Sequence, residues 1–171
     1  MGNTNAWTVL RTTDLNQALN LACRLLSVTP WYDPTGCFLD AWVNTDSDLE
    51  RLVTAFPDAQ TCSYGADGSL WPMNVSVGLE SFEQAADAFR PGMAITRCYI
   101  LWHNLKWPAV AELDLDEEYK YAELQVACNS HDIYCEKPAT EHTVFIHSRP
   151  GDQQRVEWLA DRAGTTIYGP P

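Results

Sequence analysis

Residues 119–130 read YKYAELQVACNS, and this stretch decides the fold class. Ala122, Leu124, Val126 and Cys128 alternate with more polar side chains, which is the period of a β-strand with one face buried. The segment therefore predicts a strand over residues 119–130. Its second face would present tyrosines and acids to solvent.

Other parts of the chain have strand character too. Apolar, aromatic and branched residues gather in residues 7–12 and 37–43, and residues 73–79 alternate in the same way as 119–130. Ala66-Asp67-Gly68 predicts a hairpin turn between a strand near 61–64 and the strand at 73–79. Residues 93–102 are apolar on both faces except for Arg97, which favours a central strand. Short strands are expected at 143–147 and 166–168, on either side of the last helix.

Four segments have helical spacing. They are residues 15–26, 47–56, 81–89 and 152–163. Asp14 is the expected N-cap of the first helix, Ser47 and Glu50 form a capping box for the second, and Gly164 ends the last.

This order of elements mixes hairpins with crossovers. It predicts an α+β fold, with about four helices packed on a mainly antiparallel sheet. A ferredoxin-like or split βαβ arrangement is the natural small version of that class. We expect a single domain over residues 1–171, with a long loop or a weak boundary near 104–116, where Pro108 and an acidic run occur.

Composition excludes several classes of protein. The 171 residues carry 11 basic and 23 acidic side chains, a formal charge of −12, which argues against direct nucleic-acid binding. No stretch approaches the ~18 consecutive apolar residues of a membrane-spanning helix. The first residues lack the pattern of a secretory signal, so we expect a cytoplasmic protein.

The negative charge is concentrated in two blocks. Residues 38–89 contain nine acids and one arginine, and residues 112–141 contain nine acids and two lysines. Residues 90–111 lie between them and carry three basic residues and no acid. Each block could form an acidic face, or simply a well-solvated surface.

Catalytic and metal-binding signals are weak. The chain lacks the serine-nucleophile elbow, the phosphate loop, the dinucleotide fingerprint and the zinc-protease motif. Its six cysteines are expected to be reduced in a cytosol. Cys128, His131 and Cys135 have ligand-like spacing but no adjacent fourth ligand, whereas structural zinc sites have four. We therefore expect no cofactor.

The stronger signal is a set of aromatic residues beside acids. Tyrosine and tryptophan suit interfaces because they bury a large area at little entropic cost. Trp158 lies about 200° around its helix from Val156, opposite the buried stripe, so it is either covered by a loop or a contact residue. The expected partner-binding residues are Asp114, Asp116, Glu117, Glu118, Tyr119, Tyr121, Glu123, Asp46, Asp48 and Trp158.

These observations favour a non-enzymatic acidic binding protein. It would inhibit or sequester a basic partner that handles nucleic acid, because carboxylates can occupy a channel built for phosphates. Small acidic inhibitors of restriction or CRISPR complexes, and immunity proteins of nuclease toxins, have this size and charge. One alternative is a small enzyme or metal-binding domain that uses Cys128, His131 and Cys135. Another is an accessory subunit that covers its apolar surface with a second copy.

Overall fold

A seven-stranded antiparallel sheet forms the body of the protein. The computed structural model describes residues 5–29, 31–32, 36–79 and 97–169. The strands are β1 (Asn5–Thr12), β3 (Cys37–Val43), β4 (Gln60–Ser63), β5 (Met73–Gly78), β6 (Arg97–Trp102), β8 (Glu123–Cys128) and β9 (His142–Ser148). Their order is β1-β9-β8-β6-β3-β5-β4, and every neighbouring pair is antiparallel. The predicted α+β class is confirmed, whereas the four-stranded ferredoxin-like arrangement is not adopted.

The described residues contain three α-helices. These are α1 (Leu15–Ser27), α2 (Asp46–Ala55) and α4 (Gln153–Arg162). Asp14 caps α1 as predicted, because its carboxylate accepts a hydrogen bond from the Asn16 backbone N–H at 2.9 Å. The cap of α2 is Thr45 rather than Ser47. The helix predicted at 81–89 lies outside the described residues. None of the helices in the described ranges combines the length and the apolar character that crossing a bilayer requires.

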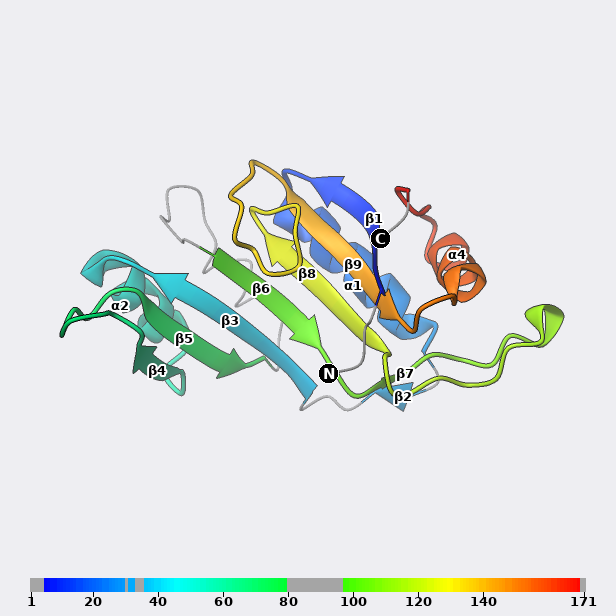
Figure 1. Ribbon diagram of the computed structural model, residues 1–171, viewed down its shortest axis with the longest axis horizontal. Helices are drawn as coiled ribbons and strands as arrows, with labels where there is room; N and C mark the ends of the chain where they lie inside the picture. Colours follow the sequence, from blue (N-terminus) through cyan, green and yellow to red (C-terminus); the bar gives the residue numbers. More distant parts are fainter. Residues whose placement is uncertain (1–4, 30, 33–35, 80–96, 170–171) are drawn as a thin grey trace.

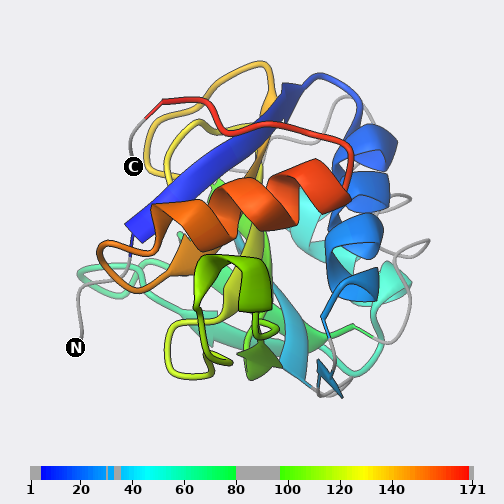
Figure 2. The ribbon, with the colours of Figure 1, turned by 90° about the vertical axis from the view of Figure 1, so that its right-hand side faces the viewer.

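The helices cover one face of the sheet. Helix α1 packs on β1, β8 and β9, α2 packs on β5, and α4 contacts β9 and α1. Figures 1 and 2 show α1 running along the back of the sheet and α4 at its right-hand end. The main core lies between helices and sheet, and the predicted stripe of Ala122, Leu124, Val126 and Cys128 belongs to it.

The opposite face of β8 and β9 is covered by a loop, residues 129–141. Gln125 was expected on a solvated face but is 4% exposed, since its side-chain amide donates to the carbonyl of Ile133 at 2.7 Å. The hydroxyl group of Thr143 likewise donates to the backbone carbonyl of Ser130 in this loop. Figure 1 shows this loop in front of β8, while the front of β3 and β5 has no helix or described loop across it.

Two predicted strands are corrected. Strand β8 begins at Glu123, so Tyr119 and Tyr121 lie in the turn before it rather than on the strand. Residues 166–168 form no strand. Instead the C-terminal segment bonds to the outer edge of β1, where Thr165 Oγ1 donates to the Val9 carbonyl and the Tyr168 N–H donates to Thr8.

The other edge of the sheet is β4. All four residues of β4 are exposed, and β5 is its strand partner in the sheet. A short second sheet pairs β2 (Trp31–Tyr32) with β7 (Leu105–Lys106). It marks the start of the segment that was expected to be a loop or boundary.

Candidate functional site: an acidic arm held by helix α4

Residues 107–119 form a narrow hairpin that we call the acidic arm. Trp107 and Glu118 exchange backbone hydrogen bonds of 2.8 and 3.1 Å, and the Val110 N–H donates to Leu115 further out. A short 3-10 turn, η2 (Ala111–Leu113), makes the tip, and Asp114 closes it with a left-handed φ of 54°. Figure 1 shows the arm projecting at the right of the molecule, beyond β7. The segment expected as a loop or boundary near 104–116 therefore has defined structure.

A buried arginine of α4 fastens this arm to the body. Arg155 is fully buried and pairs with Asp152 at 2.7 Å. Its other guanidinium nitrogens donate to the backbone carbonyls of Pro108 and, at 2.5 Å, Asp116. These carbonyls belong to the two limbs of the arm, so one cation joins both limbs to the helix. Trp107 adds a second attachment, since its indole N–H donates to the His147 carbonyl at 2.8 Å.

Three acids of the arm are already engaged within the protein. Glu112 accepts from the Trp158 indole N–H at 2.8 Å, and a bond from its own backbone together with this one lowers the pKa of Glu112. Glu117 pairs with Lys106 at 2.5 Å, and Glu118 lies 3.6 Å from Arg149. Glu117 raises the pKa of Lys106 in return. These contacts orient the arm and reduce its charge.

Asp114 and Asp116 remain available. Both are exposed, and within the described residues neither carboxylate has a hydrogen-bond or ion-pair partner. Tyr119 lies next to them in the chain, is 59% exposed, and has the Lys106 ammonium 4.8 Å from its ring centre. The structure therefore leaves two free carboxylates and one exposed ring on an otherwise neutralised arm.

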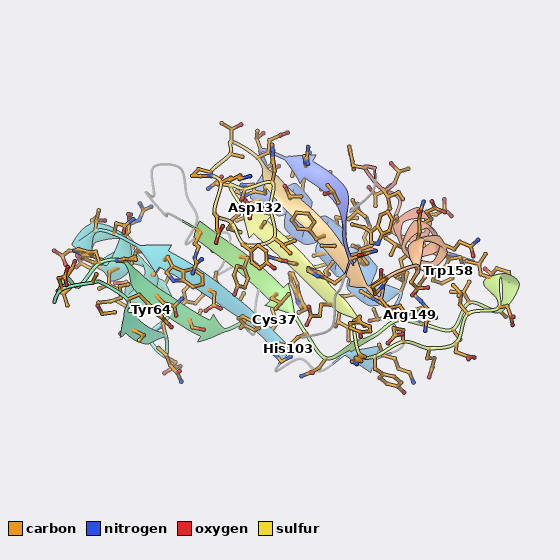
Figure 3. All side chains as sticks on the ribbon, in the orientation of Figure 1. Cys37, Tyr64, His103, Asp132, Arg149 and Trp158 are labelled. Carbon is orange, nitrogen blue, oxygen red and sulfur yellow. The ribbon has the colours of Figure 1, made fainter. Side chains whose placement is uncertain are left out.

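The remaining predicted residues of this block are less exposed. Trp158 is half-buried, because Glu112 lies against one part of it and Arg162 sits 5.0 Å from its ring centre. Tyr121 is half-buried beside Lys120. Glu123 is also half-buried, and this burial raises its pKa. Figure 3 labels Trp158 and Arg149 at the arm end of the molecule.

Among the described residues, Asp46 and the acidic arm do not share a face. Asp46 is exposed at the start of α2, which Figure 1 places at the opposite end of the sheet from the arm. Asp48, expected as a partner contact, is corrected to a buried residue at 4% exposure. One of its carboxylate oxygens is buried and finds no hydrogen-bond partner in the part of the chain that the structure describes.

Cys128, His131 and Cys135 do not converge on a metal site. Cys128 faces the main core, whereas Cys135 lies on the other side of the sheet and donates to the Cys98 carbonyl. His131 is exposed and paired with Glu141 at 3.1 Å. In the described ranges, no group of three or more histidine, cysteine or acidic side chains is placed to hold a metal ion.

A different thiol pair lies at this end of the sheet. Cys98 and Cys128 are directly opposite across β6 and β8, and both are buried. The neighbouring Cys98 thiol and His142 lower the pKa of Cys128, whereas burial, and after it the Cys128 thiol, raises the pKa of Cys98. His142 Nδ1 accepts from the Asn129 N–H at 3.1 Å, so its own proton is on Nε2. Alternation predicted that Cys128 faces the core, but not that Cys98 lies opposite it.

Arg155 is the site residue that sequence reasoning missed. A signal was present, because Arg155 lies four residues before Leu159 and next to Val156, at the edge of the buried stripe of α4. A charged residue on such a stripe must have partners, which the arm and Asp152 supply. Comparisons of the chain with protein-family models, curated proteins and solved structures found no match.

Proposed function

We propose that this chain is a non-enzymatic binding protein whose acidic arm engages a basic, nucleic-acid-handling partner and thereby inhibits or sequesters it. The observation that carries the proposal is the attachment of the arm by Arg155, with Asp114 and Asp116 left unpaired beyond it. Because Arg155 holds both limbs of the arm, these two carboxylates project from an ordered backbone.

Pre-organisation is the physical advantage of this arrangement. A flexible acidic loop would lose conformational entropy on binding, and this cost would reduce its affinity. The arm is already ordered by backbone pairing and by Arg155, so its free carboxylates can meet Lys and Arg side chains without that loss. Attraction between the net charge of −12 and a basic surface would also speed association.

Aromatic residues beside the arm can supply contact area. Tyr119 is the exposed ring, and Trp158 is a half-buried one on the adjoining helix. Interfaces commonly combine such rings at the centre with charges at the rim. Asp46 could only join the same contact if the partner reached the far end of the sheet.

The test compares retention of partners by two charge-matched variants. The immobilised protein is exposed to lysate treated with nuclease, so that bridging nucleic acid is removed, and retained proteins are identified by mass spectrometry. D114K/D116K should lose the basic, nucleic-acid-handling proteins that the wild type retains. E50K/D58K makes the same charge change at exposed positions at the other end of the sheet and should retain them.

Glu117 and Glu118 are left unchanged in this design, because reversing them would also break their pairs with Lys106 and Arg149. If D114K/D116K keeps the same partners as the wild type, the arm is not the contact surface. If the retained proteins are neither basic nor connected with nucleic acid, the class of partner is wrong.

A further inference from the structure

The open face of the sheet contains a cleft that is independent of the acidic arm. Its volume is about 400 Å³. Trp42 of β3 and Arg97 of β6 line it from the sheet, and Tyr64 and Pro72 line it from the β4–β5 connection. Cys135, Glu136 and Pro138 line it from the loop 129–141. Figure 3 shows Tyr64 and Asp132 on the two sides of this region.

The wall formed by the loop 129–141 is fixed by internal hydrogen bonds. The Asp132 carboxylate accepts from the backbone N–H groups of Tyr134, Glu136 and Lys137, at 2.9, 3.3 and 3.0 Å. Cys135 is 1% exposed, and its thiol donates to the Cys98 carbonyl at 3.1 Å. The backbone of Glu136 is thus held in place, together with both of its neighbours in the chain.

The wall formed by the β4–β5 connection is equally defined. The Tyr64 N–H donates to the Pro72 carbonyl at 2.9 Å, and Ser63 Oγ donates to the carbonyl of Leu70 at 3.0 Å. Gly65 is needed there, because a Cβ at that position would come within 2.0 Å of the Ser69 carbonyl oxygen. The cleft is therefore formed before any ligand arrives, as is usual for small-molecule sites of this size.

Arg97 gives the cleft a cation with unused donors. Its guanidinium carbon lies 3.6 Å from the centre of the Trp42 ring, so the ring holds the group by a cation–π contact. Among the described residues, no carboxylate or carbonyl accepts a hydrogen bond from it. The nearby Asp40 is instead bonded to the Tyr99 hydroxyl at 3.0 Å. A stacked guanidinium with free N–H groups matches a planar, bidentate anion such as a carboxylate.

The other residues that line the cleft determine which group can carry the carboxylate. Tyr64 is 64% exposed, and together with Pro72, Pro138 and Trp42 it offers ring surfaces that a flat apolar group would cover. Glu136 and the net charge of −12 disfavour a ligand with two negative charges. A single carboxylate on an aromatic ring fits both requirements.

We propose that this cleft binds a small aromatic monocarboxylate, with the carboxylate on Arg97 and the ring among Trp42, Tyr64 and the two prolines. The probes are 1-naphthoate, its neutral analogue 1-naphthamide, and the dianion 1-naphthyl phosphate, each titrated into the full-length protein by calorimetry. Naphthoate should bind about tenfold more tightly than the amide, which corresponds to one charge-assisted hydrogen-bonding contact. The phosphate should bind more weakly than naphthoate.

Variants separate the two parts of the site. R97Q should bring naphthoate down to the affinity of the amide and leave the amide unchanged, whereas R11Q removes the same charge from exposed Arg11 of β1 and should change neither. Y64A should weaken both probes by a similar factor, and the exposure of Tyr64 keeps the fold intact. Equal affinity for acid and amide, failure of either to saturate the wild type at millimolar concentration, or no effect of R97Q would each overturn the proposal. D114K/D116K should bind naphthoate like the wild type, so the proposal for the cleft and the proposal for the arm are tested separately.

Discussion

Arg155 and Asp116 are joined by a hydrogen bond of 2.5 Å from a buried guanidinium nitrogen to a backbone carbonyl, which ties the interior of α4 to the residue that presents a free carboxylate. The same guanidinium is paired with Asp152, whose side chain is 1% exposed. The position of the arm and the stability of the body therefore depend on the same side chain.

This coupling predicts a large effect of R155M. The substitution leaves the Asp152 carboxylate buried without its cation and removes two bonds to the arm, so the free energy of unfolding should fall by about 3–5 kcal/mol. Urea denaturation followed by fluorescence measures it. Adding D152N should restore part of the loss, because the unpaired charge is removed. If R155M alone is as stable as the wild type, Arg155 does not hold the arm.

Association with the partner should depend on salt in a way that identifies the arm. Asp114 and Asp116 are exposed, so their attraction to a basic surface is screened as the Debye length shortens from ~30 Å at 0.01 M to ~10 Å at 0.1 M salt. The association rate should fall over this range and the dissociation rate should change little. Stopped-flow measurements on the retained partner test this expectation. The milder D114N, which removes one charge and keeps Asp116, should flatten the dependence more than D58N does.

The burial of His147 predicts that the protein loses stability in mild acid. His147 Nε2 lies 2.9 Å from Gln125 Oε1, and its buried Nδ1 has no hydrogen-bond partner among the described residues. Burial lowers the pKa of His147 from 6.5 to about 4. Between these pKa values the unfolded chain binds the proton and the folded chain does not. Stability is therefore lost as the pH falls through this window, by about 2 kcal/mol between pH ~7 and ~5.

Urea denaturation at a series of pH values tests this assignment. H147Q should flatten the slope relative to the wild type, whatever its effect on stability at neutral pH. A wild-type slope that survives H147Q would place the titrating group elsewhere.

Thiol accessibility gives a fourth test of the fold. Cys23 and Cys62 are exposed, while Cys37, Cys98, Cys128 and Cys135 are buried. A disulfide reagent should thus label two thiols rapidly in the native protein and all six in guanidinium. C23S/C62S should lose the rapid phase completely. More than two fast thiols would contradict the burial of the strand cysteines.

Local patterns were sufficient to predict much of the fold. The alternation of residues 73–79 and the stripe of α1 with its Asp14 cap reflect short-range periodicity and capping, so both elements were confirmed. The end of β8 was less predictable. Tyr119 and Tyr121 continue the alternation of the strand, but bonds between the two limbs of the arm take that segment out of the sheet.

The sites depend more on long-range pairing than on local pattern. Their spacing in the sequence suggested a shared site for Cys128, His131 and Cys135. In the structure, Cys128 on the strand and Cys135 in the loop lie on opposite faces of the sheet. The partner of Cys128 is Cys98, thirty residues earlier, and strand register alone determines that pairing. Likewise, Arg97 meets Trp42 only because β6 lies beside β3.

The two edges of the sheet have different consequences for self-association. The C-terminal segment already uses carbonyls at the outer edge of β1, whereas β4 has no strand on its outer side within the described residues. A sheet with two free edges can add strands without limit and grow into a fibre. Here, pairing of β4 with β4 of a second copy would use the exposed edge of both molecules. Strand-mediated assembly of this protein would then stop at a closed, twofold pair.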